Sequence, residues 1–403
     1  MKVLVTDGNN RAALAITRSL GRAGHEVIVG EKQAPSLAQT SRYCSGRMVY
    51  PDPVTESDQF VEELARTVTA QDVDVLLPVS DITTFLVTRN RHRFPKSCAI
   101  PFADADTVER AADKVGLFSR AQQLGVAVPR SLVRHAGEAV DEADIAFPVV
   151  IKPRQSRIRT ERGWVSTGVT YARDREELRR DLASRAAHEF PVLLQERVVG
   201  PGVGVFAYYQ HGRAVAFFSH RRLRERPPWG GVSVLSESVP LCPLAREYAT
   251  ALLDDLGWHG VAMVEFKRDV RDGVPKLMEI NGRFWGSLQL AIDAGVDFPR
   301  MLVERVEQPG RQQLPYQVGV KSRWIWGDVD SLLLTLRGDS AAPDRGNGAR
   351  LRAIIDFAKV WAPGLRYDNP KIDDAMPWLF ETYRWFQRIA QDAAPAPNTG
   401  HAR

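Results

Sequence analysis

The stretch KLMEINGRFWGS, residues 276–287, carries a glutamate, an asparagine and an arginine at alternate positions of an apolar run. Side chains alternate between the two faces of a β-strand, so Glu279, Asn281 and Arg283 are predicted to share one face. The preceding apolar segment carries Glu265, and the turn DGVP is predicted to fold that segment back as an antiparallel hairpin. Two carboxylates and an amide oxygen on one sheet face form an oxygen-rich site of the kind that Mg2+ takes, usually with waters and substrate phosphates.

The spacing alone leaves a second interpretation open, because solvated sheet faces also carry alternating charged residues. Zinc is disfavoured, since the cluster contains no His or Cys. A metal bound in this way implies a polyphosphate, which needs cations elsewhere. Lys152 ends the apolar strand FPVVIKP and is a candidate; Lys114 lies in a segment with helical character, where an exposed surface lysine is the alternative.

A possible hinge follows the apolar strand in LLQERVVGPGVGVF. Gln195 and Glu196 end the strand, and a glycine-rich turn comes next. Such a hinge can present backbone donors and acceptors to an adenine edge, with Val198 against the ring. An ordinary turn would have the same composition.

The segment SHRRLRERPPWGGVSVLSES, residues 219–238, is a candidate for acceptor-substrate contacts. Arg222 could pair bidentately with a carboxylate, and Gly230 and Gly231 with Ser233 could form a backbone anion site. A mobile basic surface loop is the alternative. We expect His220 and His259 to be structural residues rather than catalytic bases.

The elements that position these residues begin with a βαβ unit in KVLVTDGNNRAALAITRSLGRAGHEVIVGE. Residues 1 to about 100 are predicted to form a parallel, Rossmann-like layer. Its first turn has one glycine and no Gly-x-Gly-x-x-Gly, which argues against a dinucleotide enzyme. Further predicted elements are helices at 104–125, about 174–188 and 243–256, and a hairpin of strands 203–209 and 214–219.

Composition is that of a soluble multidomain protein, with 403 residues, 44% hydrophobic and 26% charged. Three dispersed cysteines predict free thiols in a reducing compartment, and no leader or membrane span is expected, so the predicted location is cytoplasmic. A net charge of +5 without a clustered stripe argues against nucleic acid as a partner. Five of the nine tryptophans, including Trp361, follow residue 311, which predicts a mostly helical, aromatic-packed extension with a frayed tail from 392 onward.

In order along the chain, these motifs resemble the ATP-grasp superfamily of carboxylate-amine ligases, particularly its carbamoyl-phosphate-synthase-like members. The resemblance covers about residues 1–305 and rests on DK at 113–114, FPVVIKP, LLQERVVG, VEF and MEINGRFWGS. It implies an α/β (α+β ATP-grasp) fold. The implied domains are a Rossmann-like domain at 1–105, an ATP-grasp domain at 106–310 with its small subdomain at about 130–195, and the extension at 311–403.

The resemblance also implies roles for individual residues. Lys114 and Lys152 would contact ATP phosphates, the hinge from Gln195 to Val198 would hold adenine, and Arg283 would lie at the transferring phosphoryl group. Glu265, Glu279 and Asn281 would bind two Mg2+ ions, which Mn2+ could replace. The small-subdomain loop departs from the family, because it carries Arg154, Arg157, Arg159 and Arg162 in place of many glycines and serines. Those arginines could meet phosphate or an anionic substrate, or form a solvated loop, and no acidic residue for ribose is evident after the hinge.

The implied reaction joins a small-molecule carboxylate to an amine through an acyl phosphate, with release of ADP and phosphate. Such phosphoryl transfer needs positioning and charge neutralisation rather than a nucleophilic side chain. The alternatives are an ATP-grasp enzyme with another acceptor, such as a carboxylase or a phosphoryl transferase, a non-catalytic nucleotide-binding protein, and a nucleic-acid binder that uses residues 154–185. The extension could cap the substrate pocket or support a homodimer.

Overall fold

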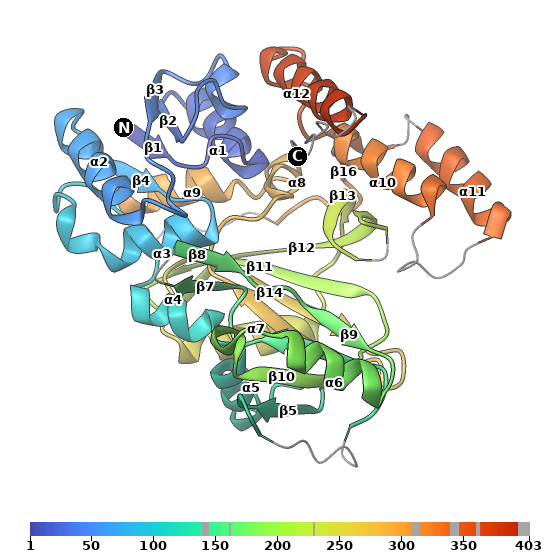
Figure 1. The fold of residues 1–403 in the computed structure, drawn as a ribbon. Coiled ribbons are helices and arrows are strands. Elements are labelled where there is room, and N and C mark those ends of the chain that lie inside the picture. Colours follow the sequence, from blue (N-terminus) through green and yellow to red (C-terminus); the bar gives the residue numbers. More distant parts are fainter. Residues whose placement is uncertain are drawn as a thin grey trace, which may run out of the picture.

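The computed structural model describes residues 1–138, 145–160, 163–228, 230–307, 315–338, 346–359 and 363–393. Arg162, Trp361 and most of the predicted frayed tail lie outside these ranges. Figure 1 shows a small parallel layer at the N-terminus and three helices of the C-terminal part at one side. Below the layer lie a small antiparallel sheet and a large sheet that is antiparallel except for one parallel pair of strands (Figure 1). In these ranges no helix combines the length and apolar character needed to cross a bilayer.

The N-terminal layer is a parallel sheet in the order β3-β2-β1-β4. Its strands are β1 (Lys2–Val5), β2 (Glu26–Glu31), β3 (Gly46–Val49) and β4 (Val75–Leu77). Its helices are α1 (Arg11–Arg22), α2 (Ser57–Ala70) and α3 (Asp81–Arg89). The apolar residues of β1, β2 and β4 are buried, as expected for a parallel sheet covered by helices, whereas Val49 in the edge strand β3 is 52% exposed. The predicted Rossmann-like layer is therefore confirmed.

Two short helices, α4 (Ala105–Ala112) and α5 (Lys114–Gln123), replace the single helix predicted at 104–125. The break falls at Asp113, whose side chain accepts hydrogen bonds from the backbone N–H groups of Val115 and Gly116. Asp113 is thus the N-cap of α5, and a cap residue leaves the helical conformation. This makes Lys114 the first residue of a helix that points into the protein.

The small sheet is antiparallel in the order β5-β10-β6-β9. It contains β5 (Ser131–Arg134), β6 (Val149–Pro153), β9 (Thr170–Ala172) and β10 (Val192–Glu196), with α6 (Arg175–Ser184) packed against it. The predicted helix at 174–188 is shorter, and a 3-10 turn, η4 (Ala187–Glu189), follows it. Two more strands, β7 (Arg157–Thr160) and β8 (Gly163–Ser166), pair only with each other.

The large sheet has the order β15-β14-β11-β12-β13-β16-β17. Its strands are β11 (Gly202–Gln210), β12 (Arg213–Arg226), β13 (Val232–Ser238), β14 (Gly260–Arg268), β15 (Pro275–Asn281), β16 (Lys321–Arg323) and β17 (Leu365–Tyr367). Helices α7 (Pro243–Asp255), α8 (Leu288–Asp293) and α9 (Phe298–Glu307) pack around it. Both predicted hairpins, β11–β12 and β14–β15, are confirmed.

The C-terminal part contains α10 (Ile325–Arg337), α11 (Gly346–Ala358) and α12 (Met376–Ala393), so its mostly helical character is confirmed. Aromatic packing is confirmed too: the rings of Trp326 and Trp385 stack with centroids 4.5 Å apart. The C-terminal part is not a separate extension, because its strands β16 and β17 belong to the large sheet. Each of these strands has three residues, too short to leave an alternating pattern in the sequence.

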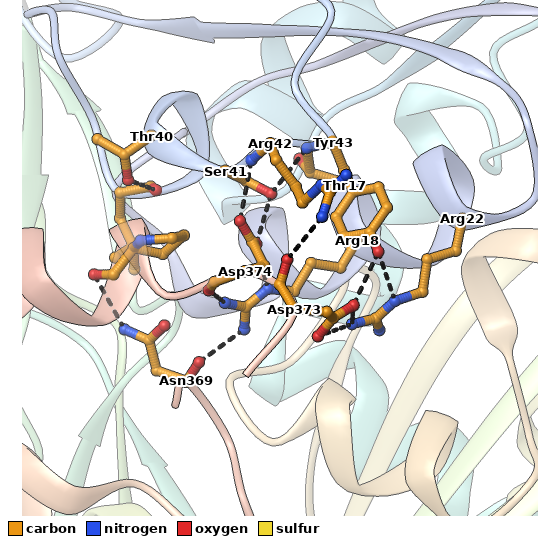
Figure 2. Close-up of polar contacts among 12 residues, drawn as sticks. Thr17, Arg18, Arg22, Thr40, Ser41, Arg42, Tyr43, Asn369, Asp373 and Asp374 are labelled. Atoms are coloured by element: carbon orange, nitrogen blue, oxygen red, sulfur yellow. Dashed lines mark hydrogen bonds and ion pairs between the residues drawn. The ribbon is translucent and has the colours of Figure 1, made fainter. Parts of the chain in front are cut away.

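Figure 2 shows how the C-terminal part is tied to α1 by a group of polar residues, which we call the Arg18 cluster: Arg18, Ser41, Arg42, Asn369 and Asp374. Arg18 Nε donates to Asp374 Oδ2 at 2.8 Å, and both side chains are 1% exposed. The guanidinium also donates to the backbone carbonyls of Asn369 and Asp374, each at 2.9 Å. Ser41 and the Arg42 backbone N–H complete the bonding of the carboxylate.

Candidate functional site

The carboxylate hairpin, formed by β14 and β15, brings the predicted metal ligands together. Glu265 and Glu279 are register partners on adjacent antiparallel strands, so their side chains emerge on the same face. Asn281 ends β15 on that face, and its Nδ2 lies 3.1 Å from Glu279 Oε1 and 3.4 Å from Glu265 Oε1. A β-bulge follows Glu265 and increases the local twist. The predicted convergence of the two carboxylates is confirmed, and Asn281 lies beside them with its amide nitrogen, rather than the predicted oxygen, toward the carboxylates.

Arg283 lies beyond the end of β15, so the prediction that the strand itself carries Glu, Asn and Arg is wrong in its last member. Its side chain nevertheless stays at the site, with one terminal nitrogen 3.4 Å from Asn281 Oδ1. Its Nε donates to Asp81 Oδ1 at 2.7 Å. Burial lowers the pKa of Arg283, but the carboxylates of Asp81, Glu279 and Glu265 together outweigh this effect and the net shift is upward. Arg283 is therefore a fixed cation that joins the carboxylate hairpin to α3 of the N-terminal layer.

Glu279 acts electrostatically on both predicted lysines, but only Lys114 lies close to it. Lys114 is 5% exposed, so the exposed-lysine alternative is wrong; its Nζ donates to Ser156 Oγ at 2.9 Å and lies 3.7 Å from Glu279 Oε2. Lys152 ends β6 and is buried beside Phe118 and Met278. Burial lowers the pKa of Lys152 to about 8, although Glu279 opposes that shift. A buried ammonium without a close carboxylate is ready to receive an anion.

The hinge side chains are committed to structural contacts. Gln195 is 1% exposed, and its Nε2 donates to Ser131 Oγ at 3.0 Å. Glu196 pairs with Arg271 at 3.0 Å and with Lys276 at 3.6 Å. Burial raises the pKa of Glu196, but its cationic partners give a net lowering. Val198 is buried. If Gln195 and Glu196 contact adenine, they do so through their backbone groups. That contact stays a prediction.

The predicted acceptor segment at 219–238 is mostly strand, because β12 runs to residue 226 and β13 begins at 232. Arg222 donates to Glu265 Oε2 at 2.7 Å and to Glu225 Oε1 at 3.1 Å, so its guanidinium already has carboxylate partners. Ser233 Oγ lies 2.9 Å from Ser236 Oγ. A Cβ at Gly231 would come within 2.4 Å of the Arg226 carbonyl oxygen, so packing explains this glycine without an anion.

Arg222 places a cation against the first metal-ligand candidate. Burial raises the pKa of Glu265; the Arg222 charge opposes this, Glu279 adds to it, and the net shift is upward. A divalent cation bound between Glu265 and Glu279 would supply the positive charge that stabilises both carboxylates in their ionised form.

The histidines have structural surroundings, as expected. His220 stacks on Phe206, its Nε2 lies 2.8 Å from Ser287 Oγ, and burial lowers its pKa to about 3. His259 stacks on His211, and burial lowers its pKa to about 4. Both rings are therefore neutral at physiological pH.

Asp81 and Ser156 are site residues that the sequence did not reveal. Asp81 is the first residue of α3, where Ser80 forms a capping box that reads as an ordinary helix start. Ser156 lies in the arginine-rich loop after Lys152. No local signal could link these residues to Arg283 and Lys114, because the contacts join distant segments.

The donor set fits Mg2+ rather than a transition metal. Within the described ranges, no three His, Cys, Asp or Glu side chains gather as a metal-binding group. The hairpin instead offers two carboxylates and one amide. Mg2+ is usually held by one or two carboxylates together with substrate phosphates and water, which is the set that this hairpin and a nucleotide would supply.

Known proteins resemble this chain in both sequence and fold. A family model described as an ATP-grasp in the biosynthetic pathway with Ter operon matches residues 188–326. D-aspartate ligase from Enterococcus faecium (strain Aus0004) is 22% identical over 276 residues, or 63% of each chain. The chain thus spans less than two thirds of that curated relative.

Solved structures extend the likeness to the fold. L-amino acid ligase from Bacillus licheniformis matches with a TM-score of 0.56 and 15% identity, over 75% of this chain and 73% of that chain. The biotin carboxylase domain dimer of Hydrogenobacter thermophilus 2-oxoglutarate carboxylase, solved with MgADP, ADP and bicarbonate, matches with a TM-score of 0.60 and 16% identity, over 79% and 73%. The predicted fold class is therefore confirmed.

Proposed function

We propose that this chain is an ATP-grasp enzyme and, more specifically, an ATP-dependent ligase that joins a small-molecule carboxylate to an amine. The reaction would pass through an acyl phosphate and release ADP and phosphate. The observation that carries the proposal is the pairing of Glu265 with Glu279 on adjacent strands, with Asn281 beside both. A ligase of this kind needs an oxygen-rich site for a cation, with buried lysines facing it. Lys114 and Lys152 are the buried lysines here.

Each residue has a part that its surroundings support. Glu265, Glu279 and Asn281 would hold Mg2+, which when bound neutralises phosphate charge during transfer. Lys152 and Lys114 would bind phosphate oxygens, and partial burial strengthens such contacts because water competes less. Arg283, fixed by Asp81, would hold the carboxylate and the transferring phosphoryl group in line. Arg222 would offset part of the cost of burying Glu265 while the metal is absent.

The amide-forming step needs no nucleophilic residue from the protein. The substrate carboxylate oxygen attacks the γ-phosphorus, the bond to the ADP oxygen breaks, and the amine nitrogen then displaces phosphate from the acyl carbon. The chain's part is to position these groups and exclude water. The D-aspartate ligase and L-amino acid ligase similarities support amino acids as the first substrates to test.

A carboxylase is the second candidate, because the fold also matches a biotin carboxylase domain. Both reactions consume ATP, so ADP release alone does not separate them. Product mass does: an amide ligase joins two substrates with loss of one water, whereas a carboxylase adds the mass of CO2.

The test is a screen of amino acids, short peptides and sugar acids, taken in pairs, for ADP release that depends on both members. Positive pairs are then analysed by mass spectrometry. The proposal predicts a condensation product with stoichiometric ADP. ADP release that requires bicarbonate and one acceptor, with a carboxylated product, would contradict it.

A further inference from the structure

A cavity of about 300 Å3 lies beside the carboxylate hairpin. The N-terminal layer, α4, the carboxylate hairpin and the hairpin β7–β8 line it. Its charged lining includes Glu279, Arg283 and Asp81, which belong to the site already described, and Arg157 and Arg159, which have no assigned role.

Some charged side chains that line the cavity have ion-pair partners, and others do not. Asp81 pairs with Arg283, and Glu279 lies 3.7 Å from Lys114. Arg157 has no hydrogen bond or ion pair from its side chain to any residue that the structure describes. Arg159 has one contact, at 4.0 Å, with an Asp58 carboxylate that is 91% exposed. Such a contact contributes little, so two cations face the cavity without a close partner.

The two arginines share one face, because they occupy alternate positions of β7. Their hairpin is not part of the small sheet; it docks on the N-terminal layer, and Figure 1 shows it beside α3 and α4. Trp164 packs edge-to-face on Phe85, with ring centroids 5.0 Å apart. The Trp164 backbone N–H donates to the Val54 carbonyl at 3.1 Å, and its indole N–H donates to Ser57 Oγ at 3.3 Å.

Gly163 makes this docking close. Its φ is +105°, and a Cβ at that position would lie 2.6 Å from the Val54 carbonyl oxygen. A side chain would therefore push the hairpin off the N-terminal layer. The N-terminal layer, rather than the small sheet, holds the arginines over the cavity.

We propose that the cavity selects an acid substrate with a second anionic group, a dicarboxylate or a phosphorylated acid, and that Arg157 and Arg159 bind this second anion. The inference rests on the proposed ligase function. The carboxylate to be activated would lie toward Arg283 and Glu279, and the second anion toward β7. Guanidinium groups bind carboxylate and phosphate through paired N–H donors. The volume is at the low end for small-molecule sites, which fits a substrate of amino-acid size.

Calorimetry with the full chain tests this, using Mg2+ and the non-hydrolysable analogue AMPPNP. The probes are matched pairs that differ in one anionic group: aspartate and asparagine, glutamate and glutamine, phosphoserine and serine, each in both enantiomers. For the wild type we expect at least one dianion to bind at least about tenfold more tightly than its neutral partner. The double variant Arg157→Ala/Arg159→Ala should lose that preference, with unchanged affinity for AMPPNP.

Two further variants sharpen the test. Trp164→Ala keeps both arginines but removes the contact by which their hairpin docks on the N-terminal layer. This variant should bind the dianion more weakly and AMPPNP with unchanged affinity. Arg213→Ala removes an exposed arginine from the β11–β12 turn and should leave both affinities unchanged.

Three results would overturn the inference. One is a wild type that prefers no dianion of the panel. Another is a double variant that loses AMPPNP affinity instead, since the arginines would then serve the nucleotide phosphates. The third is full dianion affinity in Trp164→Ala, which would remove the docking argument. Failure of the ligase proposal is separate, because it shows as the absence of a condensation product rather than as a changed affinity pattern.

Discussion

Two charged regions of this protein are built in opposite ways. In the Arg18 cluster, a buried arginine and a buried aspartate satisfy each other and the neighbouring backbone. At the carboxylate hairpin, Glu265 and Glu279 stand side by side, and Lys152 is buried without a close carboxylate. The buried charges of the first arrangement are paired within the protein, whereas those of the second gain from a bound cation and a bound polyanion. The difference indicates where the chain stabilises its fold and where it binds ligands.

The largest expected effect is on catalysis. Glu279→Gln removes one of the two carboxylates, so we expect ATP-dependent turnover to fall by about a thousandfold or more. The change in stability should be small, because Glu265 loses a like-charged neighbour while Lys114 and Lys152 lose a nearby carboxylate. Turnover is measured by ADP release and stability by thermal unfolding. Near-normal turnover in a folded variant would place the metal elsewhere.

The next effect is on stability alone. Asp374→Ala leaves the buried guanidinium of Arg18 without its carboxylate, which we expect to cost about 3 kcal/mol of unfolding free energy. Turnover per folded molecule should stay the same, since the cluster makes no contact with the carboxylate hairpin. Chemical denaturation followed by fluorescence measures the first quantity. A variant with unchanged stability and impaired turnover would contradict the view that the Arg18 cluster stabilises the fold and takes no part in ligand binding.

A smaller effect concerns pH. Burial lowers the pKa of Lys152 from 10.5 to about 8, so the folded chain binds fewer protons than the unfolded chain between these values. Charged Lys152 therefore destabilises the apo fold below about pH 8, and this cost is relieved as the pH rises. Phosphate needs the charged form, so nucleotide affinity should fall above pH 8 by up to about tenfold per pH unit.

Lys152→Arg gives the control for that prediction, because arginine keeps its charge throughout this range. The nucleotide affinity of this variant should vary little between pH 8 and pH 10. An equally steep loss in the arginine variant would assign the titration to another group.

The smallest effect is expected at the rim of the Arg18 cluster. Arg22 and Asp373 form an ion pair at 2.7 Å next to the buried pair, but their side chains are 38% and 46% exposed (Figure 2). Asp373→Ala should cost less than about 1 kcal/mol, because solvent screens exposed pairs. It is also the matched control for Asp374→Ala. A cost as large as that of Asp374→Ala would mean that burial does not decide the contribution of these pairs.

Local patterns were enough to predict the carboxylate hairpin. The alternation of Glu279 and Asn281, and a turn of suitable length after Glu265, determine the register of two neighbouring strands. The break at Asp113 was missed because a capping aspartate inside a helical pattern resembles a surface residue. The true partners of Arg222 and Arg283 come from strands and helices far away in the sequence, and no local period encodes such contacts.

The Arg18 cluster was beyond sequence analysis for the same reason. Arg18 and Asp374 are separated by 356 positions, and each lies among residues that are unremarkable on their own. Strands β16 and β17 were missed because three residues carry no readable alternation. The sequence therefore predicted the residues that meet within the carboxylate hairpin. It did not predict the contacts between segments far apart in the chain, such as the pair Arg18–Asp374.

The most direct test is the magnesium dependence of nucleotide binding. Calorimetric titration of AMPPNP with Mg2+, and with EDTA in its place, is compared between the wild type and the double variant Glu265→Gln/Glu279→Gln. The account predicts that Mg2+ strengthens binding to the wild type and has little effect on the variant. Equal affinity of the wild type with and without Mg2+, or a full magnesium effect in the variant, would contradict it.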